Sequence, residues 1–132
     1  MNFYPLASTT WDQAELDAIQ NVINKGMYSM STAVAQCEKD FAEYTKSKYC
    51  VMVSSGSTAN LIMVAALFYR KNNPLKRGDE VIVPAVSWST TYYPLYQYGL
   101  KLKFVDIDLE TLNFDLKALE GAITDKTRLI MA

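Results

Sequence analysis

Short apolar segments alternate with helical patterns along the whole sequence, and this alternation limits the possible folds more than any other feature. Apolar runs of strand length lie at residues 49–53, 80–84, 101–107 and 127–132. Such strands have little polar surface to offer solvent, so their sheet must be covered on both faces, as parallel sheets with crossover helices are. The sequence therefore predicts an α/β fold with a mainly parallel sheet and helices on both faces.

Helices are expected between these strands, and most have recognisable end signals. Thr10 and Gln13 resemble a capping box at the start of the first helix, and Gly26 is well placed to end it. Ser31 is expected to cap the second helix and Asp115 the last one. Two further helices are expected at residues 61–68 and 88–99, the latter with Pro94 in or near its first turn. No repeat or linker interrupts residues 1–132, so no internal domain boundary is expected.

Composition excludes several classes of function. The 132 residues carry 13 basic and 14 acidic side chains spread along the chain, so nucleic acid is not an expected partner. No apolar run reaches the roughly 20 residues of a membrane span, and no export signal opens the chain. Cys37 and Cys50 fit no disulfide or metal motif; free buried thiols would suit a reducing compartment, and a cytoplasmic location is expected. The apolar run at 127–132 has no polar tail, so we expect the chain to be part of a longer protein.

The inventory of reactive side chains is short. Without histidine, the chain cannot assemble a Ser-His-Asp triad, a Cys-His pair or a histidine-ligated metal site, and no metal is expected. Asp106 and Asp108 lie at a strand end beside turn-forming residues, where carboxylates more often stabilise the turn than catalyse. An α/β fold with so few acid-base groups favours an organic cofactor that supplies the reactivity.

The segment Ser54–Ser57 is a candidate phosphate site. It follows one expected strand and precedes a helix, and ligands of open α/β sheets gather at the carboxyl ends of strands. Ser55, Gly56 and Ser57 would offer backbone N–H groups, hydroxyls and the positive end of the helix dipole to an anion. The simpler alternative is that these residues only cap a buried helix. One glycine cannot form a dinucleotide-binding GxGxxG motif, and no lysine completes a P-loop.

Aromatic residues follow the next strand. Trp88 could stack on a flat aromatic ligand near the phosphate site, or it could be an ordinary core residue. A tyrosine cluster follows it and is expected to pack a helix against the sheet or against a partner chain; its members are Tyr92, Tyr93, Tyr96 and Tyr98.

Three blocks in register, at residues 51–67, 78–95 and 103–115, resemble the DegT/DnrJ/EryC1/StrS family of pyridoxal-phosphate-type sugar aminotransferases and dehydratases. The opening residues 4–20 and the segment 25–49 extend the resemblance over the whole chain. It implies the first part of an aspartate aminotransferase-type large domain, usually dimeric with shared active sites. Pyridoxal 5′-phosphate or pyridoxamine 5′-phosphate is the implied cofactor.

The resemblance also implies roles for individual residues. Ser55, Gly56 and Ser57 would hold the cofactor phosphate, and Trp88 would lie against the cofactor ring. Tyr28 and Met30 fall where relatives line the entrance to the sugar-nucleotide site.

Within the family, the sequence resembles the 3-dehydratases that remove the C3 hydroxyl of a GDP-linked 4-keto-6-deoxy sugar. These enzymes use L-glutamate as cosubstrate and supply deoxysugars such as colitose to cell-surface polysaccharide. The residue that decides the reaction, lysine in the aminotransferases and histidine in the 3-dehydratases, would lie beyond residue 132, so no catalytic residue is assigned. A sugar aminotransferase of the same family remains an alternative, and so does a non-catalytic piece that only pairs with other chains.

Overall fold

The computed structural model describes residue 5 and residues 7–132 of the chain. Tyr4 and Leu6, which belong to the opening of the family resemblance, lie outside the described residues. The chain divides into two compact units, one ending at Met52 and one beginning at Val53, and each is described by itself. The expectation of an undivided cofactor-binding domain stays a prediction.

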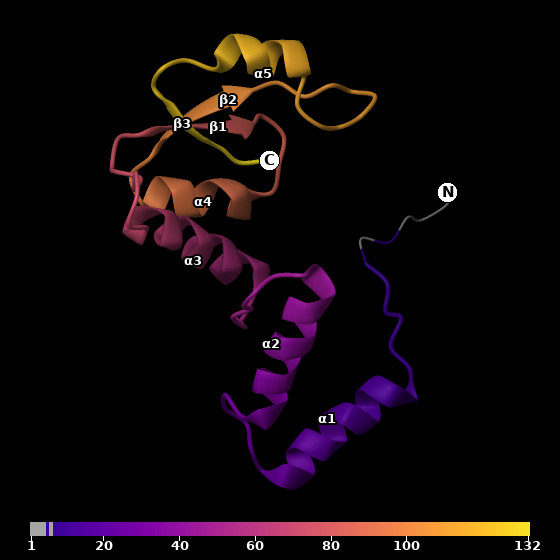
Figure 1. The fold of residues 1–132 in the computed structure, drawn as a ribbon. Helices are drawn as coiled ribbons and strands as arrows, with labels where there is room; N and C mark the ends of the chain where they lie inside the picture. Colours follow the sequence, from indigo (N-terminus) through magenta and orange to yellow (C-terminus); the bar gives the residue numbers. More distant parts are fainter. Residues whose placement is uncertain (1–4, 6) are drawn as a thin grey trace. The chain divides into compact units, whose positions relative to one another are not determined.

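The first unit contains helix α1, Gln13–Lys25 (Figure 1). Asp12 caps this helix: its Oδ1 accepts a hydrogen bond from the N–H of Ala14 at 2.7 Å, and Oε2 of Glu15 accepts one from the N–H of Asp12 at 2.8 Å. The predicted cap at Thr10 is therefore wrong by two residues, because Asp12 has the glutamate partner that completes a capping box. Gly26 ends the helix in the left-handed conformation, φ 64°, as predicted.

Helix α2, Thr32–Thr45, is the other helix among the described residues of this unit. Ser31 occupies its N-cap position, as predicted, although its side chain forms no capping hydrogen bond. The strand predicted at residues 49–53 is absent: these residues are irregular, and the side chains of Tyr49 and Val51 are exposed. A strand exists only through hydrogen bonds to a neighbour, and no described segment pairs with residues 49–53.

The second unit is built on a parallel sheet, as predicted. Its strand order is β2-β1-β3, which the sequence did not indicate. Its strands are β1, Glu80–Pro84, β2, Lys101–Val105, and β3, Thr127–Ile130. Consecutive parallel strands need a long connection that returns the chain to the same end of the sheet, and here each such connection contains a helix. All three carboxyl ends therefore meet at one edge of the sheet.

Helices cover both faces of this sheet, which confirms the predicted layers (Figure 1). Helices α3, Gly56–Tyr69, and α4, Ser89–Gln97, lie on one face, and α5, Leu116–Ala122, lies on the other. Alternate residues of β1 point to opposite faces. The larger core cluster comprises Val64, Leu75, Val81, Val83, Leu95 and Leu100, and the smaller one comprises Ile82, Val105 and Phe114.

Helix α4 differs from its prediction in one respect. Pro94 lies in the interior of the helix, past the first turn, where a proline has no N–H to continue the hydrogen-bond ladder. The helix tolerates this residue partly because Pro94 and Leu95 are buried against the rest of the unit. The tyrosine cluster is divided: Tyr92 packs edge-on against Phe104 at 5.4 Å between ring centroids, as predicted for a helix packed on the sheet. Tyr98 likewise packs on Phe68, whereas Tyr93 and Tyr96 are exposed.

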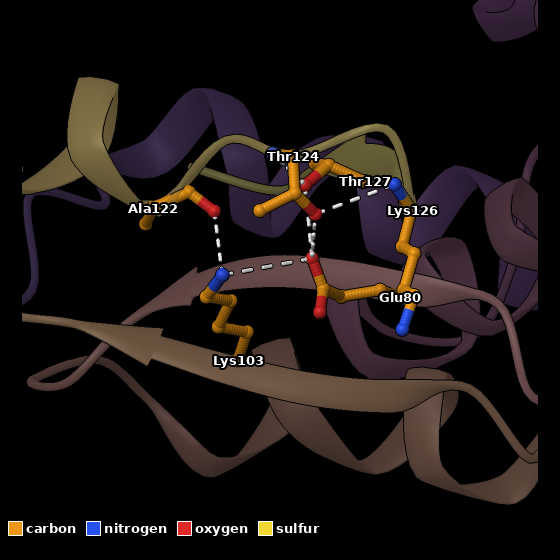
Figure 2. Close-up of polar contacts among 6 residues, drawn as sticks. All are labelled: Glu80, Lys103, Ala122, Thr124, Lys126 and Thr127. Atoms are coloured by element: carbon orange, nitrogen blue, oxygen red, sulfur yellow. Dashed lines mark hydrogen bonds and ion pairs between the residues drawn. The ribbon is translucent and has the colours of Figure 1, made fainter.

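A polar network ties α5 and the start of β3 to the other strands (Figure 2). The hydroxyl of Thr127 donates to Oε1 of Glu80 at 2.9 Å, and that of Thr124 reaches the same oxygen at 3.5 Å. The Nζ of Lys103 donates to the carbonyl of Ala122 at 2.6 Å and lies 3.8 Å from the Glu80 carboxylate. These contacts lie at the amino ends of β1 and β3, at the opposite edge of the sheet from the candidate site described next.

Candidate functional site

Helix α3 begins with a capping box that uses its own hydroxyl groups. Oγ of Ser55 accepts a hydrogen bond from the N–H of Thr58 at 3.3 Å, and Oγ1 of Thr58 accepts one from the N–H of Ser55 at 3.0 Å. The Thr58 hydroxyl also donates to the carbonyl of Ser55 at 2.8 Å. The capping interpretation therefore holds for Ser55, whose side chain stabilises the turn from which α3 starts.

Gly56 and Ser57, unlike Ser55, take no part in the capping box. They are the first two residues of α3, and within the described chain neither their N–H groups nor the Ser57 hydroxyl forms a hydrogen bond. An added Cβ at Gly56 would meet no atom within 4 Å, and the backbone there is not left-handed, so the folded chain has no steric need of its own for glycine. This donor set, at the positive end of a helix and exposed to solvent, has the chemistry that a phosphate group requires.

Trp88 occupies the N-cap position of α4, and its side chain is 72% exposed. The alternative that it is a core residue is therefore wrong for the described chain. Its carbonyl accepts a hydrogen bond from the N–H of Thr91 at 2.9 Å, which places the residue directly at the first turn of the helix. An exposed indole beside a helix start is available to a flat ligand.

The loop that carries Trp88 is held on both sides. The hydroxyl of Tyr92 donates to the carbonyl of Pro84, the last residue of β1, at 2.8 Å. Nδ2 of Asn60, on α3, donates to the carbonyl of Thr90 at 3.2 Å. The starts of α3 and α4 are thereby joined. Sequence reasoning missed Asn60; the available signal was a single amide side chain inside an otherwise apolar helix.

Tyr28 and Met30 lie in the segment between α1 and α2 and are 74% and 77% exposed. The Tyr28 hydroxyl donates to the carbonyl of Ile23 at 3.1 Å, which folds the side chain back toward the end of α1. Both residues belong to the unit that ends at Met52, whereas Gly56 and Trp88 belong to the other unit.

The acidic loop after β2 has the structural role expected for it. Oδ1 of Asp106 accepts from the N–H of Ile107 at 2.8 Å. Oδ1 of Asp108 accepts from the N–H groups of Thr111 and Glu110, at 2.9 and 2.8 Å. These backbone hydrogen bonds, that from Thr111 first, favour the charged form and lower the pKa of Asp108. Both carboxylates thus stabilise a turn.

Other features of the described residues add little to the site. Among them, no cluster of three or more histidine, cysteine, aspartate or glutamate side chains could hold a metal ion. The same residues contain no helix with both the length and the apolar character of a membrane span. Both cysteines are free, but Cys37 is exposed and Cys50 is half-buried, so the expectation of buried thiols was wrong for Cys37.

The fold and the site together define a class: an α/β domain with helices on both faces of a parallel sheet and a helix start of phosphate-binding chemistry beside an exposed indole. Residues 9–132 match the model of the DegT/DnrJ/EryC1/StrS aminotransferase family, and the chain belongs to this family. The sequence-based recognition of the family is thereby confirmed.

Individual relatives are similar over nearly the whole chain. The chain is 66% identical over 129 residues to a GDP-4-keto-6-deoxy-D-mannose 3-dehydratase of Yersinia pseudotuberculosis. The aligned region covers 98% of this chain and 33% of the relative. It therefore spans about a third of the length of the curated relatives it matches.

Solved structures agree with the sequence comparison. The E. coli GDP-4-keto-6-deoxy-D-mannose-3-dehydratase with bound hydrated PLP superimposes with a TM-score of 0.92 and 62% identity, over 98% of this chain and 33% of that one. A GDP-4-keto-6-deoxymannose-3-dehydratase with a trapped PLP-glutamate geminal diamine superimposes with a TM-score of 0.91 and 62% identity. The match covers 97% of this chain and 33% of that one.

Proposed function

We propose that these 132 residues are the N-terminal third of a GDP-4-keto-6-deoxy-D-mannose 3-dehydratase that depends on pyridoxal or pyridoxamine phosphate and on L-glutamate. The observation that carries this proposal is the 66% identity over 98% of the chain. The protein that these residues would begin is called the complete enzyme below. Its product would serve deoxysugar synthesis for cell-surface polysaccharide.

The start of α3 is the proposed site of the cofactor phosphate. The N–H groups of Gly56 and Ser57 and the Ser57 hydroxyl would donate to the phosphate oxygens, while the helix dipole favours the negative charge. The absence of a side chain at Gly56 leaves room for that approach. Ser55 would contribute indirectly, because its capping box holds the turn in the geometry that points these donors outward.

Trp88 is the proposed contact to the cofactor ring. Its exposed indole would cover one face of the ring and exclude water from it, and the contacts of the α4 start would hold the indole in place. The bound cofactor would supply the electron sink for loss of the C3 hydroxyl, chemistry that no side chain of this chain offers. Tyr28 and Met30 are proposed as neighbours of the GDP-linked sugar, on the family resemblance alone.

The residue that decides the reaction is proposed to lie in the part of the complete enzyme that follows these residues. For this reason none of the lysines of the chain is assigned to catalysis, and the isolated 132-residue chain is expected to be inactive. Glutamate-dependent consumption of GDP-4-keto-6-deoxy-D-mannose by the isolated chain would contradict this.

A nucleotide-sugar aminotransferase is the second candidate, favoured by the description of the matched family as aminotransferases. The test is to incubate the complete enzyme with pyridoxal phosphate, reduce it with borohydride, and search for a covalent label by mass spectrometry. A lysine amine can link to the cofactor aldehyde, whereas histidine cannot form that bond. A label on one lysine would favour the aminotransferase; tight cofactor binding without a label would support the 3-dehydratase.

We also propose that the complete enzyme is a cytoplasmic homodimer that acts without nucleic acid or membrane partners. The formal net charge of -1 and the family resemblance support this proposal. Sedimentation of the complete enzyme as a monomer at assay concentrations would contradict the dimer.

A further inference from the structure

Asn60 is a polar side chain within an apolar helix, and it has a specific partner. It lies one turn after Gly56 on α3, and its amide Nδ2 donates to the backbone carbonyl of Thr90 at 3.2 Å. The two residues are 30 positions apart in the sequence, and their hydrogen bond is partly buried. This bond links α3 to the first turn of α4.

The partner carbonyl needs this donor because of Pro94. In an α-helix the carbonyl of Thr90 would accept from the N–H four residues later, and that residue is Pro94, which has no N–H. An unpaired carbonyl in a partly buried place costs free energy. Asn60 replaces the donor that the helix itself lacks, so the proline creates the acceptor and the asparagine uses it.

The bond connects the two parts of the proposed cofactor site. Gly56 and Ser57 precede Asn60 within one turn of α3, and Trp88 is two residues before Thr90. Tyr92 anchors the same helix start to the end of β1, and Asn60 joins it to α3 close to the phosphate-binding residues.

We propose that Asn60 is a positioning residue for the cofactor: through the carbonyl freed by Pro94, it sets the position of Trp88 relative to the phosphate-binding start of α3. This inference rests on the proposed function. A ligand with a phosphate at one end and a flat ring at the other is bound well only when both contacts are held at the matching separation.

The first test uses Asn60→Ala and Asn60→Asp in the complete enzyme, with pyridoxal phosphate as the probe. Aspartate keeps the shape of asparagine but presents only acceptors to the carbonyl. Both variants should bind pyridoxal phosphate about fivefold more weakly, since one lost hydrogen bond is worth about 1 kcal/mol. The circular dichroism induced in the bound cofactor should also change, because the indole would no longer hold the ring in one orientation.

A matched control separates this effect from the loss of any asparagine bond. Nδ2 of Asn113 also donates to a backbone carbonyl, that of Thr111, at 3.2 Å, in the exposed loop after β2. Asn113→Ala should leave cofactor affinity and induced circular dichroism unchanged. A purely structural role for Asn60 would lower the melting temperature of Asn60→Ala but leave both cofactor readouts at wild-type values, and that result would overturn the inference.

A second test uses Pro94→Ala, which returns an N–H to the carbonyl of Thr90. In that background Asn60→Ala should change the dissociation constant by less than about twofold, because the helix supplies its own donor. If Asn60→Ala weakened cofactor binding equally in the wild-type and the Pro94→Ala enzyme, the carbonyl of Thr90 would not be the target of Asn60. That result would overturn the inference. Wild-type enzyme that binds no pyridoxal phosphate would overturn the proposed function with it, whereas wild-type binding with unaffected variants overturns the inference alone.

Discussion

Replacing Ser55 and Ser57 separately by alanine should distinguish the stability of α3 from its ligand binding. The Ser55 hydroxyl accepts the N–H of Thr58 at 3.3 Å in the capping box. The Ser57 hydroxyl, two residues further on, forms no hydrogen bond within the described chain and is exposed. The two serines thus have the same side chain at nearly the same place but different surroundings.

The expected magnitudes differ in kind. Loss of an N-cap side chain costs about 1 kcal/mol, and the length of the Ser55 bond argues for no more than that, so Ser55→Ala should lower the melting temperature by a few degrees. Ser57→Ala should leave the melting temperature unchanged. It would remove a hydrogen bond to a charged phosphate, worth about 1.5–3 kcal/mol, which corresponds to roughly 10- to 100-fold weaker cofactor binding.

The assay measures thermal unfolding of the complete enzyme without cofactor and then its titration with pyridoxal phosphate. Ser31→Ala is the matched control, because Ser31 holds the same N-cap position on α2 without a side-chain hydrogen bond and should cost less than Ser55→Ala. The reasoning would be refuted if Ser57→Ala lowered the melting temperature while cofactor affinity stayed at the wild-type value. It would also be refuted if Ser55→Ala and Ser31→Ala were equally stable.

Three further predictions follow from individual environments. Leu95→Ala should destabilise the fold by about 2–5 kcal/mol in chemical denaturation, because Leu95 is fully buried; a loss below that of an exposed site would contradict it. Backbone hydrogen bonds, that from Thr111 first, hold the pKa of Asp108 in the folded protein below its ordinary value of 3.8. The charged carboxylate therefore contributes to folding stability above pH 3.8, and this contribution is lost as the pH falls through the lowered pKa of the folded state. Asp108→Asn should flatten this acid loss, measured as melting temperature against pH. Trp88→Ala should weaken pyridoxal phosphate retention, whereas Tyr96→Ala, equally exposed on α4, should not; equal retention in the two variants would remove Trp88 from the site.

Local patterns predicted most of the elements in the second unit. The strands at 80–84 and from 101 onward, and the last helix capped by Asp115, follow from apolar runs and capping side chains within a few residues of each other. The capping box of Ser55 and Thr58 is local in the same way. Such features are encoded within a single turn or strand, where sequence neighbours are also spatial neighbours.

The errors arose where a local signal depended on a distant or a competing partner. Residues 49–53 are apolar enough for a strand, but no described segment pairs with them. Thr10 and Gln13 resembled a cap, but Asp12 with Glu15 forms the better one. Pro94 was expected in or near the first turn of its helix, and it lies further inside α4.

The sequence by itself determined the alternation of strands and helices, the family, and the candidate residues Ser55, Gly56, Ser57 and Trp88, because periodicity, capping and motif order are properties of neighbouring residues. Only the tertiary structure decided the strand order β2-β1-β3, the separate roles of the two serines, and the exposure of Trp88. It also paired Asn60 with the carbonyl that Pro94 leaves free. Those features depend on which groups packing brings together, and a hydrogen bond between residues 30 positions apart has no signature in either segment alone.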